Sequence, residues 1–208
     1  GSFLNSAGLY LPAIGFATLY GPVVAGWFAL AERMVKLPLT LIGNSAAQVY
    51  MGEAAAKARQ APGGMRALFK SFAIKLSVFG LLPAVVFFSG GPVIFGAVFG
   101  PDWATAGTIA KWLSLASAVR LVASPLSQTL SLMERQGIQV LWEGSRVACI
   151  GAVFWLAHSY GWEPVTCVLS YSLVMMASYL TIIALSWFAL PAWTAGRGRN
   201  QPSALETT

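Results

Sequence analysis

The sequence predicts an all-α, polytopic membrane protein: a bundle of six transmembrane helices over residues 1–190, followed by a polar tail over residues 191–208. The hydrophobic fraction is 57% and the charged fraction is 10%, against about 25% charged residues in an ordinary soluble domain. Mean hydropathy is +0.68. Apolar runs long enough to cross a bilayer recur along the chain, and Gly, Pro and charged clusters separate them.

The first two predicted spans are uncharged over most of their length. Residues 3–20 form a run of 18 without Asp, Glu, Lys or Arg, and Gly21-Pro22 ends it. Residues 23–56 form the second span, which has 34 residues. A helix of that length would measure about 51 Å, so it must overhang the membrane or bend. Pro38 offers a place for a bend, because proline removes a helical hydrogen bond.

A basic loop over residues 57–70 precedes the third span, which covers residues 71–89. Gly90-Gly91-Pro92 is a strong turn signal and is expected to end this span. Residues 93–103 are then expected to form a short re-entrant or interfacial segment that ends in Phe-Gly-Pro-Asp-Trp.

Three further spans complete the predicted bundle, and two turns separate them. The spans cover residues 104–133, 138–159 and 165–188, and the turns lie at residues 134–137 and 161–164. The tail after Pro191 is rich in Arg, Asn, Gln, Pro and Ser, and such a composition predicts disorder.

Basic residues alternate between the predicted connections and set the orientation. The connections after spans one, three and five contain no Lys or Arg. The other connections and the tail contain seven: Lys57, Arg59, Arg66, Lys70, Arg135, Arg197 and Arg199. Because cytoplasmic loops are enriched in Lys and Arg, we expect both ends of this segment on the cytoplasmic side of a bacterial inner membrane. The chain opens directly in an apolar run, so we also expect it to be one half of a longer protein.

A charged cluster lies within the second span, where a charged side chain that faced lipid would cost about 2.5–3.5 kcal/mol or more. Glu32 and Lys36 are four residues apart and are expected to pair on one helix face. Arg33 lies about 100° round the helix and remains as net positive charge. This cluster is the first indication of a polar cavity within the membrane.

Arg120 lies midway along the fourth span, and no acidic residue is closer to it in sequence than Glu134. Two interpretations are open. Arg120 forms a buried ion pair with Glu32 or Glu143, or Arg33 and Arg120 line a cavity and attract an anion. Guanidinium groups suit phosphate because their donors form a bidentate fork.

The candidate substrate-binding residues are Arg33, Arg120 and Lys36. Arg146 has Glu143 three residues before it, so a local ion pair is expected there. Glu32 and Glu143 are the acidic residues at depth, and they either couple transport to a cation gradient or serve as ion-pair partners.

Motifs of soluble enzymes are missing from the sequence. His158 is the only histidine, the two cysteines lack CxxC spacing, and HExxH, GxxxxGK[ST] and GxSxG do not occur. We therefore expect no enzymatic activity, no metal, no cofactor and no nucleic-acid partner. An ion gradient, a partner or the gradient of the substrate itself must supply the driving force.

Three sequence blocks occur in a characteristic order. The first is Gly26-Trp27-Phe28-Ala29-Leu30-Ala31-Glu32-Arg33, followed by Pro38, Ile42-Gly43 and Gln48-Val49-Tyr50. The second is Phe99-Gly100-Pro101-Asp102-Trp103-Ala104-Thr105-Ala106-Gly107. The third is Ser124-Pro125-Leu126, followed by Glu134-Arg135-Gln136. Together they resemble the C-terminal half of Wzx-like O-antigen and exopolysaccharide flippases. These proteins, often described as lipopolysaccharide biosynthesis proteins, belong to the multidrug/oligosaccharidyl-lipid/polysaccharide superfamily.

The resemblance implies a fold of twelve or more helices in two pseudo-symmetric bundles of six, facing each other across a cavity. The N-terminal bundle of the same protein would then be a partner, together with membrane lipid, a polysaccharide polymerase and glycosyltransferases. The implied substrate is an oligosaccharide linked to undecaprenyl pyrophosphate, moved between leaflets by alternating access. Two alternatives remain: a drug/cation antiporter, which would favour acidic residues in its cavity, and a scaffold subunit, in which Arg33 and Arg120 would both be held in ion pairs.

Overall fold

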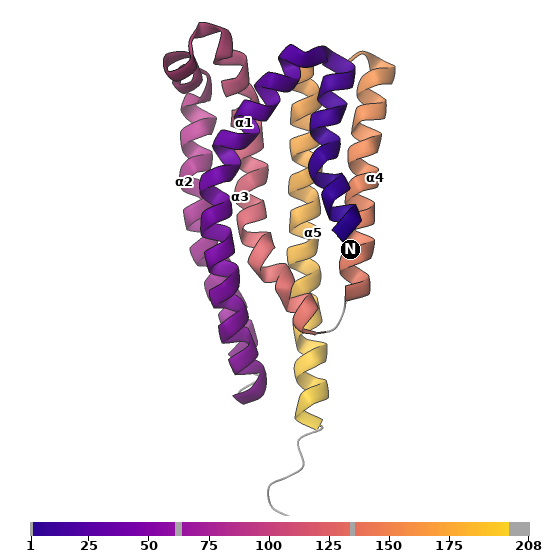
Figure 1. Cartoon of the computed structure of the whole chain (residues 1–208). Coiled ribbons are helices and arrows are strands. Elements are labelled where there is room, and N and C mark those ends of the chain that lie inside the picture. Colours follow the sequence, from indigo (N-terminus) through magenta and orange to yellow (C-terminus); the bar gives the residue numbers. More distant parts are fainter. Residues whose placement is uncertain (1, 61–63, 134–135, 200–208) are drawn as a thin grey trace, which may run out of the picture.

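The structure is a computed structural model that describes residues 2–60, 64–133 and 136–199, and every regular element in these ranges is helical. In order, the elements are α1 (Ser2–Gln60), α2 (Met65–Phe99), the 3₁₀ helix η2 (Pro101–Trp103), α3 (Ala104–Leu132), α4 (Gln136–Tyr160) and α5 (Pro164–Arg199). The described residues hold five α-helices that are long and apolar enough to cross a membrane (Figure 1). The all-α fold class is confirmed, and these five helices indicate a membrane-embedded protein.

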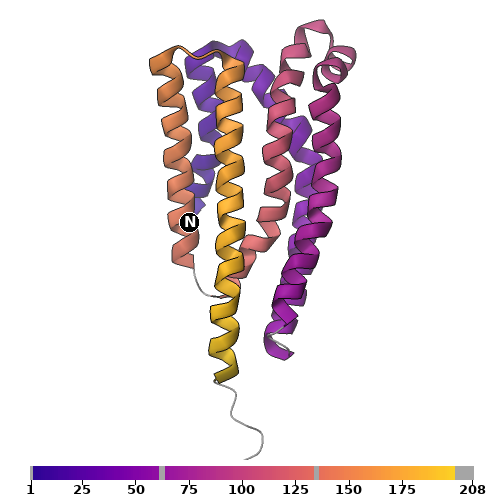
Figure 2. The ribbon, with the colours of Figure 1, turned by 180° about the vertical axis from the view of Figure 1, so that it is seen from behind.

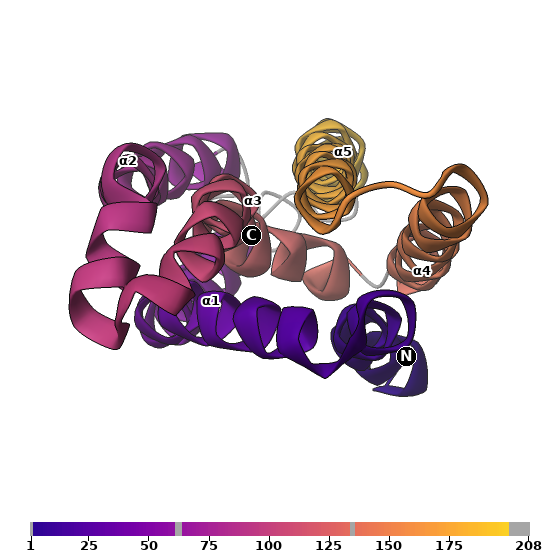
Figure 3. The same ribbon diagram turned by 90° about the horizontal axis from the view of Figure 1, so that it is seen from above.

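Helix α1 changes direction at Gly21, whose φ of 83° and ψ of 177° are not helical. Residues 2–20 form a first arm beside α4, and residues 22–60 form a second arm that runs along α3 (Figures 1 and 3). The break predicted at Gly21-Pro22 is therefore present as a bend. The described chain has five helices, one of them bent, where six separate helices were predicted.

Aromatic contacts fix the bend. The ring of Phe16 lies 4.4 Å from that of Phe28 in the second arm and 5.1 Å from that of Phe154 in α4, measured between centroids. The Tyr20 hydroxyl donates a hydrogen bond of 3.0 Å to the carbonyl oxygen of Trp162. The first arm is thus packed against α4 and against the turn that follows it.

Gly21→Ala is expected to lower the free energy of unfolding by about 1–3 kcal/mol, because this backbone conformation is essentially restricted to glycine. Gly26→Ala is the matched control on the same helix, since a Cβ at either position would meet no atom within 4 Å. Thermal unfolding of the purified variants in detergent measures the difference. Equal melting temperatures for the two variants would show that the bend does not need glycine.

Helix α3 is the central element of the bundle, and it packs against α1, α2 and α5 (Figures 2 and 3). In its most apolar window 61% of residues are buried, against 17–33% in the corresponding windows of the other four helices. By this measure α3 is the most buried of the five candidate spans.

Helix α2 continues through Gly90-Gly91-Pro92, so the predicted break and the predicted re-entrant segment over residues 93–103 are wrong. A Cβ on Gly91 would lie 2.5 Å from the carbonyl oxygen of Gly107 in α3. These glycines therefore allow two helices to meet backbone to backbone, as small residues do in membrane proteins. The chain reverses only at Gly100, where φ is 103°, and through η2.

The changes of direction alternate between the two ends of the bundle. The bend at Gly21, the turn at η2 and the turn after Tyr160, where Gly161 has a φ of 61°, lie at one end (Figure 1). The C-terminal ends of α1, α3 and α5 lie at the other end (Figure 1). This alternation matches the predicted order of the connections. Which end faces the cytoplasm stays a prediction.

Two segments that were predicted to be irregular contain helix. Helix α1 extends to Gln60 and α2 begins at Met65, so most of the basic loop predicted over residues 57–70 is helix. Helix α5 continues to Arg199, well into the predicted tail. Residues 61–63, 134–135 and 200–208 lie outside the described residues. Basic composition was an unreliable sign of a loop, because Lys and Arg are good helix formers.

Candidate anion-binding groove

A polar groove of about 270 Å³ lies between α3, α4 and α5 and also includes Lys36 of α1. Its lining consists of Lys36, Arg120, Ala123, Ser124, Ser127, Gln128, Gln139, Trp142, Glu143, Arg146, Tyr171, Met175, Tyr179 and Ile182. Two smaller spaces, of about 50 and 20 Å³, share Lys36 and Arg120 with it. This volume is slightly below that of typical small-molecule sites and suits a compact polar group.

Regular helical spacing brings these side chains to one place. On α3 the polar lining residues are Arg120, Ser124, Ser127 and Gln128, at i, i+4, i+7 and i+8. On α5 the lining residues recur at i, i+4, i+8 and i+11, from Tyr171 to Ile182. Each helix therefore turns one continuous stripe toward the same space.

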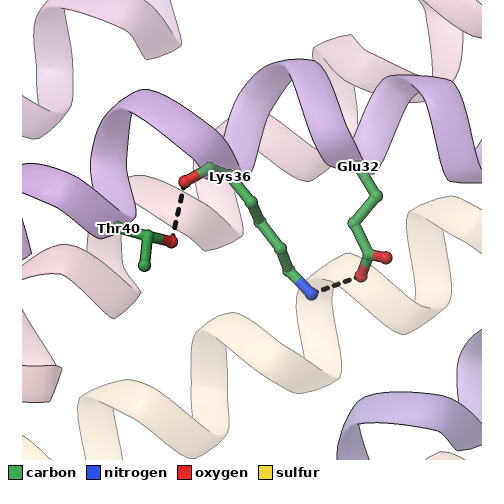
Figure 4. Close-up of polar contacts among 3 residues, drawn as sticks. All are labelled: Glu32, Lys36 and Thr40. Atoms are coloured by element: carbon green, nitrogen blue, oxygen red, sulfur yellow. Dashed lines mark hydrogen bonds and ion pairs between the residues drawn. The ribbon is translucent and has the colours of Figure 1, made fainter.

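The predicted ion pair within α1 is confirmed. Lys36 Nζ donates a hydrogen bond to Glu32 Oε1 (Figure 4). Thr40 Oγ1 donates a second one, of 2.8 Å, to the Lys36 carbonyl oxygen (Figure 4). Lys36 lines the groove and both smaller spaces, but Glu32 already balances its charge.

Arg120 is half-buried and lines the groove and both smaller spaces. Among the described residues the Glu32–Lys36 pair is the one ion pair, so Arg120 is bridged neither to Glu32 nor to Glu143. Of the two interpretations of Arg120, the buried ion pair is therefore contradicted. Its guanidinium group remains available to a ligand in the groove.

Arg33 is exposed and lines neither the groove nor the two smaller spaces. The expected shared cavity of Arg33 and Arg120 is therefore not formed. The physical reason is helical geometry: Lys36 and Glu32 share the face of α1 that turns toward α3, and Arg33 points about 100° away from Glu32.

The predicted ion pair between Glu143 and Arg146 is also wrong, since no such pair forms within the described chain. Both residues are buried, with 9% and 7% of their surface exposed, and both line the groove. The Arg146 guanidinium carbon instead lies 4.9 Å from the centre of the Trp142 ring. The Nε atom of Arg146 has no hydrogen-bond partner in the described part of the chain.

Trp142 holds this stacked arginine in place. Its indole Nε1 donates a hydrogen bond of 2.8 Å to the Ser178 carbonyl oxygen on α5, which fixes the ring plane. An arginine over an aromatic face keeps the edge of its guanidinium group free. Stacking thus orients Arg146 without using the donors that a phosphate oxygen needs.

The groove carries a surplus of positive charge. Glu32 neutralises the charge of Lys36. The remaining charged residues of the described lining are Arg120, Arg146 and Glu143, and their net charge is one positive unit. Buried charges cost much free energy unless they are paired. A bound anion would remove this cost, and Tyr, Ser and Gln side chains nearby supply further hydrogen bonds.

Sequence reasoning assigned Arg146 only to a local ion pair, and it did not single out the lining tyrosines Tyr171 and Tyr179. The signal was present for the tyrosines: they lie eight residues apart in the interior of the last predicted span, away from the interfacial level where Tyr is usual. Buried tyrosines at helical spacing indicate a polar space within the bundle.

The described residues contain no group of His, Cys, Asp and Glu side chains that could hold a metal ion. His158 is exposed near the end of α4. The groove brings together two arginines that form no ion pair within the described residues. Comparisons with protein-family models, with curated proteins and with solved structures give no match for this chain.

Proposed function

We propose that this chain is one lobe of a membrane transporter that binds the pyrophosphate group of a lipid-linked oligosaccharide and moves it across a bacterial inner membrane. The observation that carries the proposal is the pair of guanidinium groups, on Arg120 and Arg146, that line one polar groove without a carboxylate partner. Charged groups at such depth in an apolar bundle are usually functional.

The size and chemistry of the groove support a diphosphate as the recognised group. Two arginines and several hydroxyl groups line the groove. Its volume of about 270 Å³ can hold a compact anion but not a whole oligosaccharide. The sugar would extend into space shared with a second six-helix bundle of the same protein, and the lipid tail would remain in the bilayer. A polymerase and glycosyltransferases complete the proposed set of partners.

The geometry favours this proposal over the two alternatives. A drug/cation antiporter would place surplus acid in the groove, whereas the described lining has surplus base. A purely structural scaffold would hold its deep arginines in ion pairs, and the described chain has no such pair for Arg120. Glu143 is the residue that an antiporter role would use, and it is the one acidic side chain in the described groove lining.

The test is binding of undecaprenyl pyrophosphate by the purified protein in lipid nanodiscs, with undecaprenol as the uncharged probe. We expect the pyrophosphate to bind more tightly than the alcohol. Arg120→Gln is expected to weaken binding about tenfold to a hundredfold, because hydrogen bonds to charged groups contribute about 1.5–3 kcal/mol. Arg33→Gln removes the same charge outside the groove and is expected to bind as the wild type does.

Each other outcome identifies an alternative. Equal binding of the alcohol and the pyrophosphate would contradict recognition of the anion. Tighter binding of tetraphenylphosphonium, a lipophilic cation, would favour the antiporter. Equal losses in Arg120→Gln and Arg33→Gln would point to a general effect of positive charge and not to the groove.

A further inference from the structure

A second space lies on the opposite face of α3, and it is apolar. It measures about 230 Å³, and α2 contributes Ser77 and Leu81 to it, α3 contributes Val119 and Val122, and α5 contributes Leu180 and Ile183. Figure 2 shows α3 between α2 and α5 on this side. The Ser77 hydroxyl donates to the carbonyl oxygen of Ala73 in its own helix, at 2.7 Å. The space therefore offers a ligand mainly hydrocarbon contacts.

Aromatic and basic side chains lie on the same two helices, α2 and α5, beyond one end of this space. The Phe69 ring of α2 lies 5.5 Å from the Trp187 ring of α5, and the guanidinium carbon of Arg66 lies 5.4 Å from the same tryptophan. Lys70 follows Arg66 by one helical turn and is exposed, as Arg66 is. Neither basic residue forms an ion pair within the described residues.

The basic pair and the apolar space lie along one seam. On α2 the residues Arg66, Lys70, Ser77 and Leu81 fall at i, i+4, i+11 and i+15, which is one face of a helix. On α5 the residues Leu180, Ile183 and Trp187 fall at i, i+3 and i+7 and also share a face. Lys70 is about 10 Å along the axis from Ser77, because each residue rises about 1.5 Å.

We propose that this seam binds one anionic phospholipid, with its phosphate at Arg66 and Lys70 and one acyl chain in the apolar space. Juxtamembrane basic residues attract anionic headgroups, and tryptophan is enriched at headgroup level. The first turn of α2 carries no acidic residue that would oppose the phosphate. A helix about 10 Å across does not fit a space of 230 Å³, whereas part of an acyl chain does.

This site is independent of the proposed transport function. Its residues differ from those of the groove, and a lipid bound there would be retained by a transporter, an antiporter or a scaffold alike. Failure of one proposal therefore leaves the other standing.

The first part of the test compares headgroups. Delipidated protein in detergent is titrated with phosphatidylglycerol or phosphatidylcholine, and native mass spectrometry measures how much lipid is bound. We expect phosphatidylglycerol to bind more tightly. The double variant Arg66→Gln/Lys70→Gln should lose about thirtyfold in affinity for it, and Lys70→Gln alone about fivefold. Lys75→Gln is the matched control, because Lys75 is exposed on the same helix but on its opposite face.

The single variant Lys70→Gln keeps the stacking of Arg66 on Trp187, so it tests the headgroup contact without disturbing that packing. An affinity for phosphatidylglycerol that is unchanged in both the single and the double variant would overturn the proposal. Equal losses in Lys75→Gln would overturn it as well, since they would indicate general attraction to a basic surface.

The second part of the test asks whether an acyl chain occupies the apolar space, by filling that space with a larger side chain. Leu180→Trp adds bulk within the space, at a side chain that is 52% exposed, and is expected to lower phosphatidylglycerol affinity at least fivefold. Leu185→Trp makes the same change on the other face of α5, where the side chain is 38% exposed, and should have no effect. Inorganic phosphate that bound as tightly as the lipid, or equal behaviour of the two variants, would show that the space holds no acyl chain.

Discussion

Gly107→Ala is expected to lower the free energy of unfolding by about 3 kcal/mol or more, at or above the upper end of the usual overpacking range. A Cβ at this position would lie 2.3 Å from the carbonyl oxygen of Gly91 and 2.6 Å from the Cα atom of Pro92. Both are backbone atoms, so no side-chain rotation can relieve the clash. Helices α2 and α3 would have to separate at the point where the buried glycines Gly91 and Gly107 meet.

A graded series tests this expectation by thermal unfolding in detergent. A Cβ at Gly96, on α2, would meet no atom within 4 Å, so Gly96→Ala should retain wild-type stability or gain slightly from helix propensity. Gly80→Ala would bring a Cβ to 3.0 Å from the carbonyl oxygen of Ala118 and should be intermediate. If Gly107→Ala and Gly96→Ala had the same melting temperature, the close contact of α2 with α3 would be disproved.

The same glycines explain where sequence reasoning about the fold failed. Gly90-Gly91-Pro92 and Gly21-Pro22 are similar local signals, and both predicted a break. The chain bends at Gly21, whereas it stays helical at Gly91 because Gly107 packs against it. Local sequence cannot distinguish a glycine that turns the chain from one that admits a neighbouring backbone, since the neighbour lies 16 positions away in sequence.

Within the candidate site, the sequence correctly predicted one contact between residues that are close in sequence. Glu32 and Lys36 pair as their spacing predicts, because both lie on one face of one helix. The same rule failed for Glu143 and Arg146, since Trp142 offers the guanidinium group an aromatic surface and takes it away from the carboxylate. The grouping of Arg120 with Arg146 depends on how α3, α4 and α5 pack, and no local pattern contains that information.

Arg146→Met is expected to weaken pyrophosphate binding about tenfold to a hundredfold and, in the same protein, to raise the melting temperature without ligand. The binding loss follows from removing one of the two unpaired cations in the groove. The gain in stability follows because a desolvated charge without a carboxylate partner costs free energy, and an apolar side chain of similar length does not carry that cost. A residue with a purely structural role would lose stability when replaced.

Glu143→Gln should shift binding in the opposite direction, to about tenfold tighter pyrophosphate binding, because it removes the one unpaired carboxylate of the described groove lining. Arg146→Lys keeps the charge but loses the planar donor fork and the stacking on Trp142, so it should recover only part of the affinity. The measurement is a titration with inorganic pyrophosphate, paired with thermal unfolding of each variant. If Arg146→Met and Glu143→Gln changed the affinity in the same direction, the charge of the groove would not control binding, and the anion site would have to be abandoned.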